Sequence, residues 1–306
     1  MGKIAFVFSG QGAQYSGMGK SLYELGGAAA KLYNDAESVR PGTMSQSFAG
    51  TDDELKLTVN TQPCLYLVDL GAALSLNDNG IYADAVAGFS LGEVAALAYA
   101  GAYSYNDGFK IVTSRGEFMS DASKGYEAGM AAVLKLDAET VTDLTNGVEN
   151  LYAVNYNCPG QTVVSGTKEA VECFVEKVKE VGGRAIPLAV SGAFHSPFMA
   201  DASEKFKSEL TNYVIKKPEI PVYANFTAEP YGEDVINTLA MQMKSPVKWQ
   251  KTIENMIADG FTDFIEVGAG KTLSGLIKKI SKEVRVYSVE DAASLEQTIQ
   301  AVKSNA

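Results

Sequence analysis

The stretch of sequence with the clearest chemical potential reads GFSLGE, in which Ser90 stands between Gly88 and Gly92. Small and apolar residues over 83–88 predict a buried strand before the serine, and residues 94–99 predict a helix after it. This is the context of a G-x-S-x-G nucleophile elbow, in which side chains at the two glycines would collide with neighbouring backbone. Ser90 is therefore a candidate nucleophile. The alternative is a serine that only caps the following helix.

His195 is the only histidine in the chain, so it is the one candidate of its type for a base. A serine hydroxyl is a weak nucleophile and needs a positioned base, which is usually histidine. His195 lies in a small-residue turn before a helix that we expect to start at Ser196 and Pro197. The positive end of a helix disfavours a protonated ring by about 0.3–1 kcal/mol, which keeps the imidazole neutral, as a general base must be. A structural histidine is the alternative, and no carboxylate is singled out to orient the ring.

A glycine-rich loop, residues 9–21, follows the first apolar run and invites a phosphate-binding interpretation. A dinucleotide fingerprint needs glycine where Tyr15 stands, and a P-loop ending in GKS needs glycine where Gln14 stands. A second near miss at residues 270–272 fails at Ile265. The loop therefore argues against nucleotide binding. It favours the other use of glycine, which is to bring backbone N–H groups close to a reacting atom.

Composition narrows the class of protein and of partner. The 306 residues carry a formal net charge of −11, which argues against nucleic acid or an anionic membrane as the main partner. Cys64, Cys158 and Cys173 form no C-x-x-C pair, so we expect neither disulfides nor a metal site. The first residues are too short for a secretory signal, and no apolar run approaches the roughly 20 residues of a membrane span. We expect a soluble, cytoplasmic protein.

The expected order of strands and helices differs between two parts of the chain, and both parts position these residues. Outside residues 128–195, single strands alternate with helices, which predicts an α/β domain with a central, mainly parallel sheet. The strands are expected at residues 3–8, 83–88, 218–225, 261–267 and 285–289. The helices are expected at residues 26–40, 61–76, 94–99, 106–120 and 252–259. Residues 41–60 look mixed and polar, with no clear element.

Between these parts the order becomes β-α-β-β-α-β, which is that of a ferredoxin-like unit. Its strands are expected at residues 130–136, 151–157, 161–166 and 184–190, and its helices at residues 137–146 and 168–181. We therefore predict a small α+β domain over 128–195, inserted into a larger domain formed by 1–127 and 196–306.

Seven motifs in order resemble one family, the malonyl-CoA:acyl carrier protein transacylases, over residues 4 to 290. The motifs are GQGAQ (10–14), TQP (61–63), GFSLGE (88–93), SRG (114–116), AFHSPFM (193–199), SPVKW (245–249) and EVGAGK (266–271). The resemblance implies an α/β-hydrolase-like large domain with the ferredoxin-like insertion. It also implies a ping-pong transfer without a cofactor, in fatty acid biosynthesis.

In that reaction Ser90 attacks the malonyl thioester with His195 as base, and free coenzyme A departs. The phosphopantetheine thiol of an acyl carrier protein then attacks the malonyl-serine ester. The resemblance places the oxyanion hole at the backbone N–H groups of Leu91 and Gln11. It also implies that a main-chain carbonyl, at Gln242, orients the histidine, which explains why no carboxylate stands out.

The resemblance also assigns the malonyl group a partner. An arginine in a helix is usually on the surface, but Arg115 of the SRG motif is implied to grip the malonyl carboxylate with its planar guanidinium. Phe194 matches the malonyl-selecting form of its motif. Three further positions are implied to lie near the pocket, namely Gln62, Asn155 and Gln161. Many family members have histidine where this chain has Phe89, so the contact of that histidine to substrate is missing here.

An acidic carrier protein requires a local basic patch on a chain of net charge −11. The residues that cluster in the sequence are Lys271, Lys278, Lys279, Lys282 and Arg285. The alternative for this cluster is a solvated helix face. We expect a monomer. Three rival interpretations are a serine hydrolase on a similar elbow, a discrete acyltransferase that loads a polyketide synthase carrier, and a non-catalytic scaffold.

Overall fold

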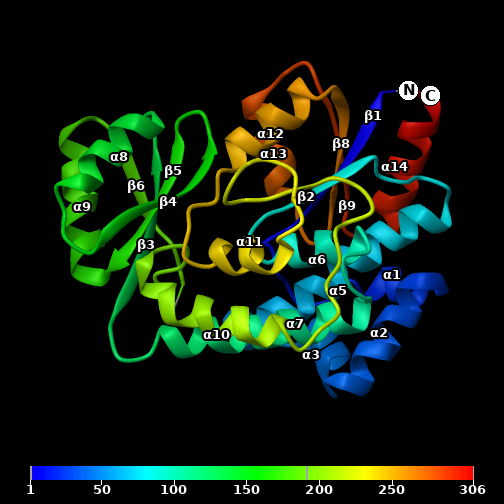
Figure 1. Cartoon of the computed structure of the whole chain (residues 1–306). Coiled ribbons are helices and arrows are strands. Elements are labelled where there is room, and N and C mark those ends of the chain that lie inside the picture. The colour runs from blue at the N-terminus through cyan, green and yellow to red at the C-terminus, as the bar shows by residue number, and fades with distance from the viewer. Residues whose placement is uncertain (1, 191, 306) are drawn as a thin grey trace.

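The computed structural model describes residues 2–190 and 192–305, arranged as two sheets with their helices (Figure 1). The residues outside this description are Met1, Ser191 and Ala306. Of these, Ser191 is the first residue of the turn expected before His195. The smaller sheet lies on the left in Figure 1, and both chain ends lie on the right, beside β1 and α14.

The larger sheet has five strands in the order β7-β2-β1-β8-β9, and every neighbouring pair is parallel. Successive residues of the central strand β1 (Lys3–Phe8) belong to opposite hydrophobic clusters, with Phe6 and Phe8 on one side and Ala5 and Val7 on the other. Both faces of the sheet are thus covered, as parallel sheets require. The other strands are β2 (Ala85–Gly88), β7 (Val222–Tyr223), β8 (Phe261–Val267) and β9 (Arg285–Val289).

Helices cover both faces, and the longest of them, α5 (Thr58–Asp78), is buried over most of its length. The remaining helices of the larger part are α1 (Lys20–Glu24), α2 (Gly27–Val39), α3 (Thr43–Ala49), α4 (Asp52–Lys56), α6 (Gly92–Tyr99), α7 (Tyr105–Ala122), the short 3₁₀ helix η1 (Pro197–Met199), α10 (Ala200–Leu210), α11 (Val235–Gln242), α12 (Trp249–Ala258), α13 (Thr272–Ile280) and α14 (Ala292–Ser304).

The smaller sheet is antiparallel, with the order β4-β5-β3-β6. With two helices this is the strand order of a ferredoxin-like unit, and the predicted α/β fold class is confirmed. Its elements are β3 (Ala128–Leu134), α8 (Ala138–Asn146), β4 (Leu151–Cys158), β5 (Gln161–Thr167), α9 (Lys168–Glu180) and β6 (Arg184–Pro187). That residues 128–195 form a separate inserted domain stays a prediction.

Backbone hydrogen bonds join the smaller sheet to the segment that leads into α12. The N–H of Val247 donates to the carbonyl of Val154 over 2.8 Å, and the N–H of Tyr156 donates to the carbonyl of Val247 over 2.9 Å. The same segment is tied to the larger sheet, because the N–H of Lys248 donates to the carbonyl of Asn225 over 2.9 Å. The two sheets are therefore linked beside the residues that form the site.

Several predicted boundaries were wrong for identifiable reasons. Residues 41–60 contain α3 and α4, and the second of these begins with a capping box between Thr51 and Glu54. The strand expected at 218–225 shortens to β7, because Pro218 and Pro221 have no N–H to donate to a ladder. Strand β6 ends at Pro187 and not at residue 190, so that the next residues leave the sheet and line cavities.

Candidate active site

Ser90 lies in the sharp turn between β2 and α6, with a left-handed backbone at φ 55°. A Cβ at Gly88 would lie 1.9 Å from the carbonyl carbon of Gly92, and one at Gly92 would lie 2.4 Å from the carbonyl oxygen of Phe8. The predicted steric need for both glycines is therefore confirmed. Such strained serines characterise nucleophile elbows, where the turn lifts the hydroxyl clear of the sheet.

Asn225, which follows β7, anchors the elbow from the neighbouring strand. Its side-chain oxygen accepts the N–H of Ser90 over 2.8 Å, and its side-chain nitrogen donates to the carbonyl of Gly88 over 2.6 Å. Asn225 is fully buried, so these bonds are shielded from water. Sequence analysis missed this residue, because nothing distinguishes one asparagine after a strand from another.

His195 meets Ser90 although 105 residues separate them. The distance from His195 Nε2 to Ser90 Oγ is 2.8 Å, and His195 Nδ1 lies 3.0 Å from the main-chain carbonyl oxygen of Gln242. A carbonyl only accepts, so Nδ1 carries the proton and Nε2 is left to accept from the serine hydroxyl. The arrangement is a serine–histidine pair oriented by a backbone carbonyl.

The pKa of His195 is lowered from 6.5 to about 4, mainly by burial and then by the positive charge of Arg115. The ring is therefore neutral at physiological pH, as expected from sequence, but for a different principal reason. The helix that follows starts with Ser196 as its N-cap and only a short 3₁₀ turn, η1, before α10. The low-dielectric surroundings and the neighbouring guanidinium dominate.

Arg115, on α7, is completely buried, which corrects the ordinary expectation for an arginine in a helix. Its Nη1 donates to Gln62 Oε1 over 2.8 Å, and its Nη2 donates to Gln242 Oε1 over 2.8 Å and to Ser90 Oγ over 3.1 Å. Burial lowers the pKa of Arg115 to about 10, so the group stays a cation at neutral pH. A fixed positive charge thus lies beside the candidate nucleophile.

Glu93 and Gln242 hold this arrangement from behind. The Gln242 side chain donates to the carbonyl of Ser90 over 2.7 Å and to Glu93 Oε2 over 3.2 Å. The Glu93 carboxyl also accepts the N–H of Asn225 over 2.9 Å and the hydroxyl of Tyr231. Burial raises the pKa of Glu93 to about 7. Sequence analysis missed the role of Glu93, although its place in GFSLGE was a signal.

A cavity opens over Ser90 and collects most of the residues singled out from the sequence. They are Gln11, Gln62, Ser90, Leu91, Arg115, Asn155, Phe194 and His195. Among the described residues, the backbone N–H groups of Leu91 and Gln11 have no hydrogen-bond partner. Gln242 lies behind the cavity and does not line it. Gln161 does not line it either, and lines the adjoining cavity instead.

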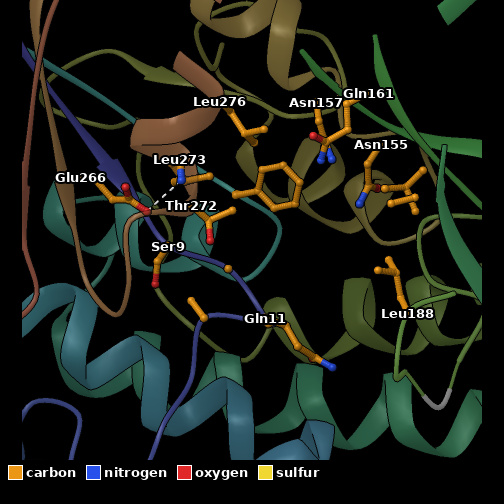
Figure 2. A pocket seen from close by; sticks show the side chains of 16 residues that line it. Ser9, Gln11, Asn155, Asn157, Gln161, Leu188, Glu266, Thr272, Leu273 and Leu276 are labelled. Carbon is orange, nitrogen blue, oxygen red and sulfur yellow. Dashed lines mark hydrogen bonds between the residues drawn. The ribbon is translucent and has the colours of Figure 1, made fainter. Parts of the chain in front are cut away.

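That adjoining cavity runs between the smaller sheet and α13 (Figure 2). Amide side chains of Asn155, Asn157 and Gln161 lie on one side, and Leu273 and Leu276 lie on the other. The side-chain oxygens of the two asparagines are buried and have no partner among the described residues. The two cavities adjoin, because four residues line both, namely Gln11, Phe89, Asn155 and Leu188.

Phe89, the residue before Ser90, packs edge-on against Trp249 with 5.5 Å between ring centroids. Its ring forms an apolar wall where the two cavities meet. Two other features are absent from the described part of the chain. No group of three or more His, Cys, Asp or Glu side chains there could hold a metal ion, and none of its helices is long and apolar enough to cross a membrane.

A serine that contacts a neutral histidine, beside two backbone N–H groups that have no partner among the described residues, suits the transfer of acyl groups. Comparison with known proteins agrees with this class. The Acyl transferase domain family matches residues 5–305. The malonyl CoA-acyl carrier protein transacylase of Bacillus subtilis (strain 168) is 43% identical, with 99% of this chain and 98% of the relative covered.

Solved structures agree. The malonyl CoA-acyl carrier protein transacylase from Clostridium perfringens superposes with a TM-score of 0.95 at 38% identity, covering 99% of this chain and 98% of that one. A malonyl-transacylase in complex with its type II PKS acyl-carrier protein superposes with a TM-score of 0.94 at 30% identity, covering 98% and 99%. This chain belongs to the acyl transferase family and, within it, to the malonyl CoA-acyl carrier protein transacylases.

Proposed function

We propose that the chain transfers a malonyl group from malonyl-CoA to the phosphopantetheine thiol of acyl carrier protein, as an acyl-carrier-protein S-malonyltransferase of fatty acid biosynthesis. One observation carries this proposal. The Arg115 guanidinium lies in the same cavity as the Ser90–His195 pair and is only 3.1 Å from Ser90 Oγ. A buried cation at that distance suits an acyl group with a carboxylate at its far end.

In the first half of the reaction, His195 Nε2 takes the proton of Ser90 Oγ as the oxygen attacks the thioester carbonyl. Negative charge develops on the carbonyl oxygen, and the N–H groups of Leu91 and Gln11 stabilise it. The intermediate collapses with cleavage of the carbon–sulfur bond. The imidazolium then returns its proton to the departing thiolate, which leaves as free coenzyme A.

The second half reverses these roles. His195 Nε2 accepts the proton of the carrier protein's phosphopantetheine thiol, and the sulfur attacks the malonyl-serine ester. The carbon–oxygen bond breaks, and the proton passes from the imidazolium to Ser90 Oγ. Proton, acyl group and leaving group balance in both halves, so each step needs only the chain's own groups and the two substrates.

Arg115 selects the acyl group in this account. The malonyl carboxylate accepts two parallel bonds from the guanidinium, replacing the bonds to Gln62, Gln242 and Ser90. Hydrogen bonds to a charged group contribute roughly 1.5–3 kcal/mol each. An acetyl group has no carboxylate to make them. Phe194, which lines the same cavity, adds bulk that crowds a branched acyl group.

We place the pantetheine arm of either thioester in the adjoining cavity (Figure 2). The arm has two amides, each with an N–H that can donate. The unpartnered side-chain oxygens of Asn155 and Asn157 suit such donors, and Leu273 and Leu276 suit the arm's methylene groups. Gln161 belongs to this part of the site in the proposal.

The carrier protein is proposed to dock on a basic patch, which we define as Lys278, Lys279 and Lys282. These side chains are exposed and have no ion-pair partner among residues 2–190 and 192–305. Of the five residues predicted, Lys271 pairs with Glu290 and Arg285 pairs with Asp263. The patch lies at the end of the helix, α13, that also lines the proposed arm cavity.

Charge reversal tests the basic patch. Lys278→Glu with Lys279→Glu should raise the KM for carrier protein several-fold, most at low salt, and leave the KM for malonyl-CoA unchanged. Lys177→Glu with Lys303→Glu is the matched control, since both lysines are exposed, form no ion pair among the described residues and line no cavity described above. An unchanged KM for carrier protein would remove the docking proposal.

We further propose that the protein acts as a monomer in the cytoplasm. Its three cysteines, all among the described residues, are free thiols, which suits a reducing compartment. Loading the carrier protein of a polyketide synthase is the second candidate function. It is favoured by the structural similarity to a malonyl-transacylase that was solved in complex with its type II PKS acyl-carrier protein.

Isolation of the acyl-enzyme tests the transfer. The chain is incubated with malonyl-CoA and separated by gel filtration from unbound malonyl-CoA and coenzyme A. It is then mixed with carrier protein that has or lacks the phosphopantetheine arm. The expected result is a malonyl mass increase on the armed carrier protein only, with loss of the adduct from the enzyme. Release of malonate at the same rate with either carrier protein would support a hydrolase and contradict the proposal.

A further inference from the structure

Ser9 and Asp69 form a buried polar pair that the proposed reaction does not use. Ser9 follows β1 directly, and Asp69 lies in α5, with exposed fractions of 1% and 0%. The Ser9 hydroxyl donates to Asp69 Oδ1 over 2.7 Å. Asp69 Oδ2 has no partner among the described residues. A buried carboxyl with one side-chain partner is costly, so its position calls for a physical explanation.

The pair lies where the loops after β1 and β8 touch. The N–H of Ser9 donates to the carbonyl of Val267 over 3.3 Å. A Cβ at Gly268 would lie 1.7 Å from Asp69 Oδ1, so the backbone there runs directly against the carboxyl. The ends of both strands are thus packed around the Ser9–Asp69 hydrogen bond.

The next residues of the same loop pack against the elbow. A Cβ at Gly10 would lie 2.7 Å from the carbonyl oxygen of Phe89, the residue before Ser90. Figure 2 shows Ser9 and Gln11 on one stretch of chain at the edge of the cavity. The loop is therefore held on one side by Asp69 and on the other by the elbow. Gln11 comes directly after these two contacts in the chain.

Asp69 shares one face of α5 with two other acceptors, Thr58 and Gln62. Spacings of four and seven residues bring all three to the same side of a helix. Thr58 Oγ1 accepts from the Gln11 side chain over 3.3 Å, and Gln62 Oε1 accepts from Arg115 over 2.8 Å. One buried helix face therefore contacts the glycine-rich loop twice and the arginine once.

We propose that Asp69 is a positioning residue, which fixes the Ser9–Gln11 loop so that the Gln11 N–H points at the developing oxyanion. This inference rests on the proposed function, because the oxyanion role of Gln11 belongs to it. Asp69 touches no substrate. Its effect passes through the Ser9 hydroxyl to the backbone of Gly10 and Gln11. Loss of one oxyanion donor typically costs about 10²–10³ in rate, and a displaced donor costs part of that.

Two substitutions at Asp69 separate the hydrogen bond from the packing. Asp69→Asn keeps an oxygen that accepts from Ser9, whereas Asp69→Leu keeps the number and branching of the side-chain heavy atoms and removes the acceptor. We expect the asparagine variant to retain kcat within about threefold. We expect the leucine variant to lose about 10–100-fold in kcat, with the KM for malonyl-CoA nearly unchanged, because the defect lies in the transition state.

Ser9→Ala removes the same bond from the other side and tests the proposal if the leucine variant does not fold. It should lower kcat as Asp69→Leu does, and the double variant should lose no more than either single one. Three results would overturn the proposal: an unchanged kcat in Ser9→Ala, an equal loss in Asp69→Asn and Asp69→Leu, or multiplied losses in the double variant.

A fluorophosphonate probe distinguishes failure of this inference from failure of the proposed function. The probe forms a tetrahedral adduct on an activated serine, and its phosphoryl oxygen occupies the oxyanion position without any malonyl group. Slower modification of Ser90 in Ser9→Ala, in protein of unchanged melting temperature, supports the inference even if malonyl transfer fails. Equal modification rates in the two proteins contradict the inference even if malonyl transfer succeeds.

Discussion

The two ends of the site differ in how their polar groups are satisfied. Around Arg115, three acceptors already occupy the guanidinium, from Gln62, Gln242 and Ser90. In the adjoining cavity, the buried side-chain oxygens of Asn155 and Asn157 have no partner among the described residues. The acyl end is a network around a fixed charge, in which both terminal guanidinium nitrogens of Arg115 have acceptors and Nε has no partner among the described residues. The arm end is a channel with open acceptors and an apolar wall.

This difference predicts different costs of substitution. At the acyl end a ligand that contacts the terminal nitrogens of Arg115 must replace existing bonds, so it binds well there only if its own bonds are stronger. A carboxylate meets that condition, because charge-assisted bonds are roughly twice as strong as neutral ones. At the arm end a ligand adds bonds without breaking any. Changes near Arg115 should therefore alter the choice of acyl group, and changes near Asn157 should only weaken binding.

The largest effect is expected from Ser90→Ala, which removes the atom that carries the acyl group. Transfer of malonyl to carrier protein should fall by about 10⁴-fold or more, because the remaining groups only bind and polarise the thioester. Steady-state transfer measured by the mass of the carrier protein checks this. Ser38→Ala on α2 is the control and should behave as wild type. A loss below tenfold in Ser90→Ala would exclude this serine as the nucleophile.

The next largest effect is expected from Arg115→Ala. Two charge-assisted bonds of roughly 1.5–3 kcal/mol each predict a fall of about 10²–10⁴ in kcat/KM for malonyl-CoA. The value for acetyl-CoA should stay constant or rise. Arg115→Lys keeps the charge without the planar fork and should lie between wild type and alanine. Equal losses for both thioesters would show that Arg115 supports the fold of the site and not its selectivity.

The pH dependence of acylation tests the protonation state of His195. The base must be neutral, and the pKa of His195 is about 4. The rate of acylation by malonyl-CoA should therefore be flat from about pH 8 to 5 and fall below that. The folded-state pKa lies below the ordinary 6.5, so stability should also be lost as the pH falls from 6.5 toward 4. A single-turnover rate of acylation that falls with an apparent pKa near 6.5 would contradict the buried, neutral imidazole.

The smallest effect is expected from Asn157→Ala, at the arm end. One open acceptor contributes roughly 0.5–1.5 kcal/mol, which predicts a rise of about 2–10-fold in the KM for malonyl-CoA. The kcat and the preference for malonyl over acetyl should not change. A changed preference for malonyl over acetyl would contradict the conclusion that the two ends act independently.

Much of the site could be predicted because its motifs occur in a recognisable order. Three segments far apart in the chain carry Ser90, His195 and the Gln242 carbonyl. In the structure His195 lies 2.8 Å from Ser90 Oγ and 3.0 Å from the Gln242 carbonyl oxygen, as the motifs implied. The steric role of the two elbow glycines also followed from their spacing alone. The α/β fold class followed from the alternation of strands and helices outside residues 128–195.

The burial of Arg115 and the roles of Glu93 and Asn225 could not be predicted, because they depend on packing that no local pattern reveals. Arg115 lies in a helix with ordinary polar neighbours, and only the packing of α5 against α7 shows that it is buried. Glu93 and Asn225 are common residues whose hydrogen bonds cross more than 130 positions of sequence. The cause of the low pKa of His195 was misjudged for the same reason.

The most direct test of the account is the intact mass of the protein after brief incubation with malonyl-CoA or acetyl-CoA. Wild type should gain one malonyl group, and peptide mapping should place it on Ser90. Ser90→Ala should gain none, and Arg115→Ala should gain less malonyl or gain acetyl instead. Folded wild-type protein that gains no acyl group from either thioester would contradict the account of a malonyl-serine intermediate.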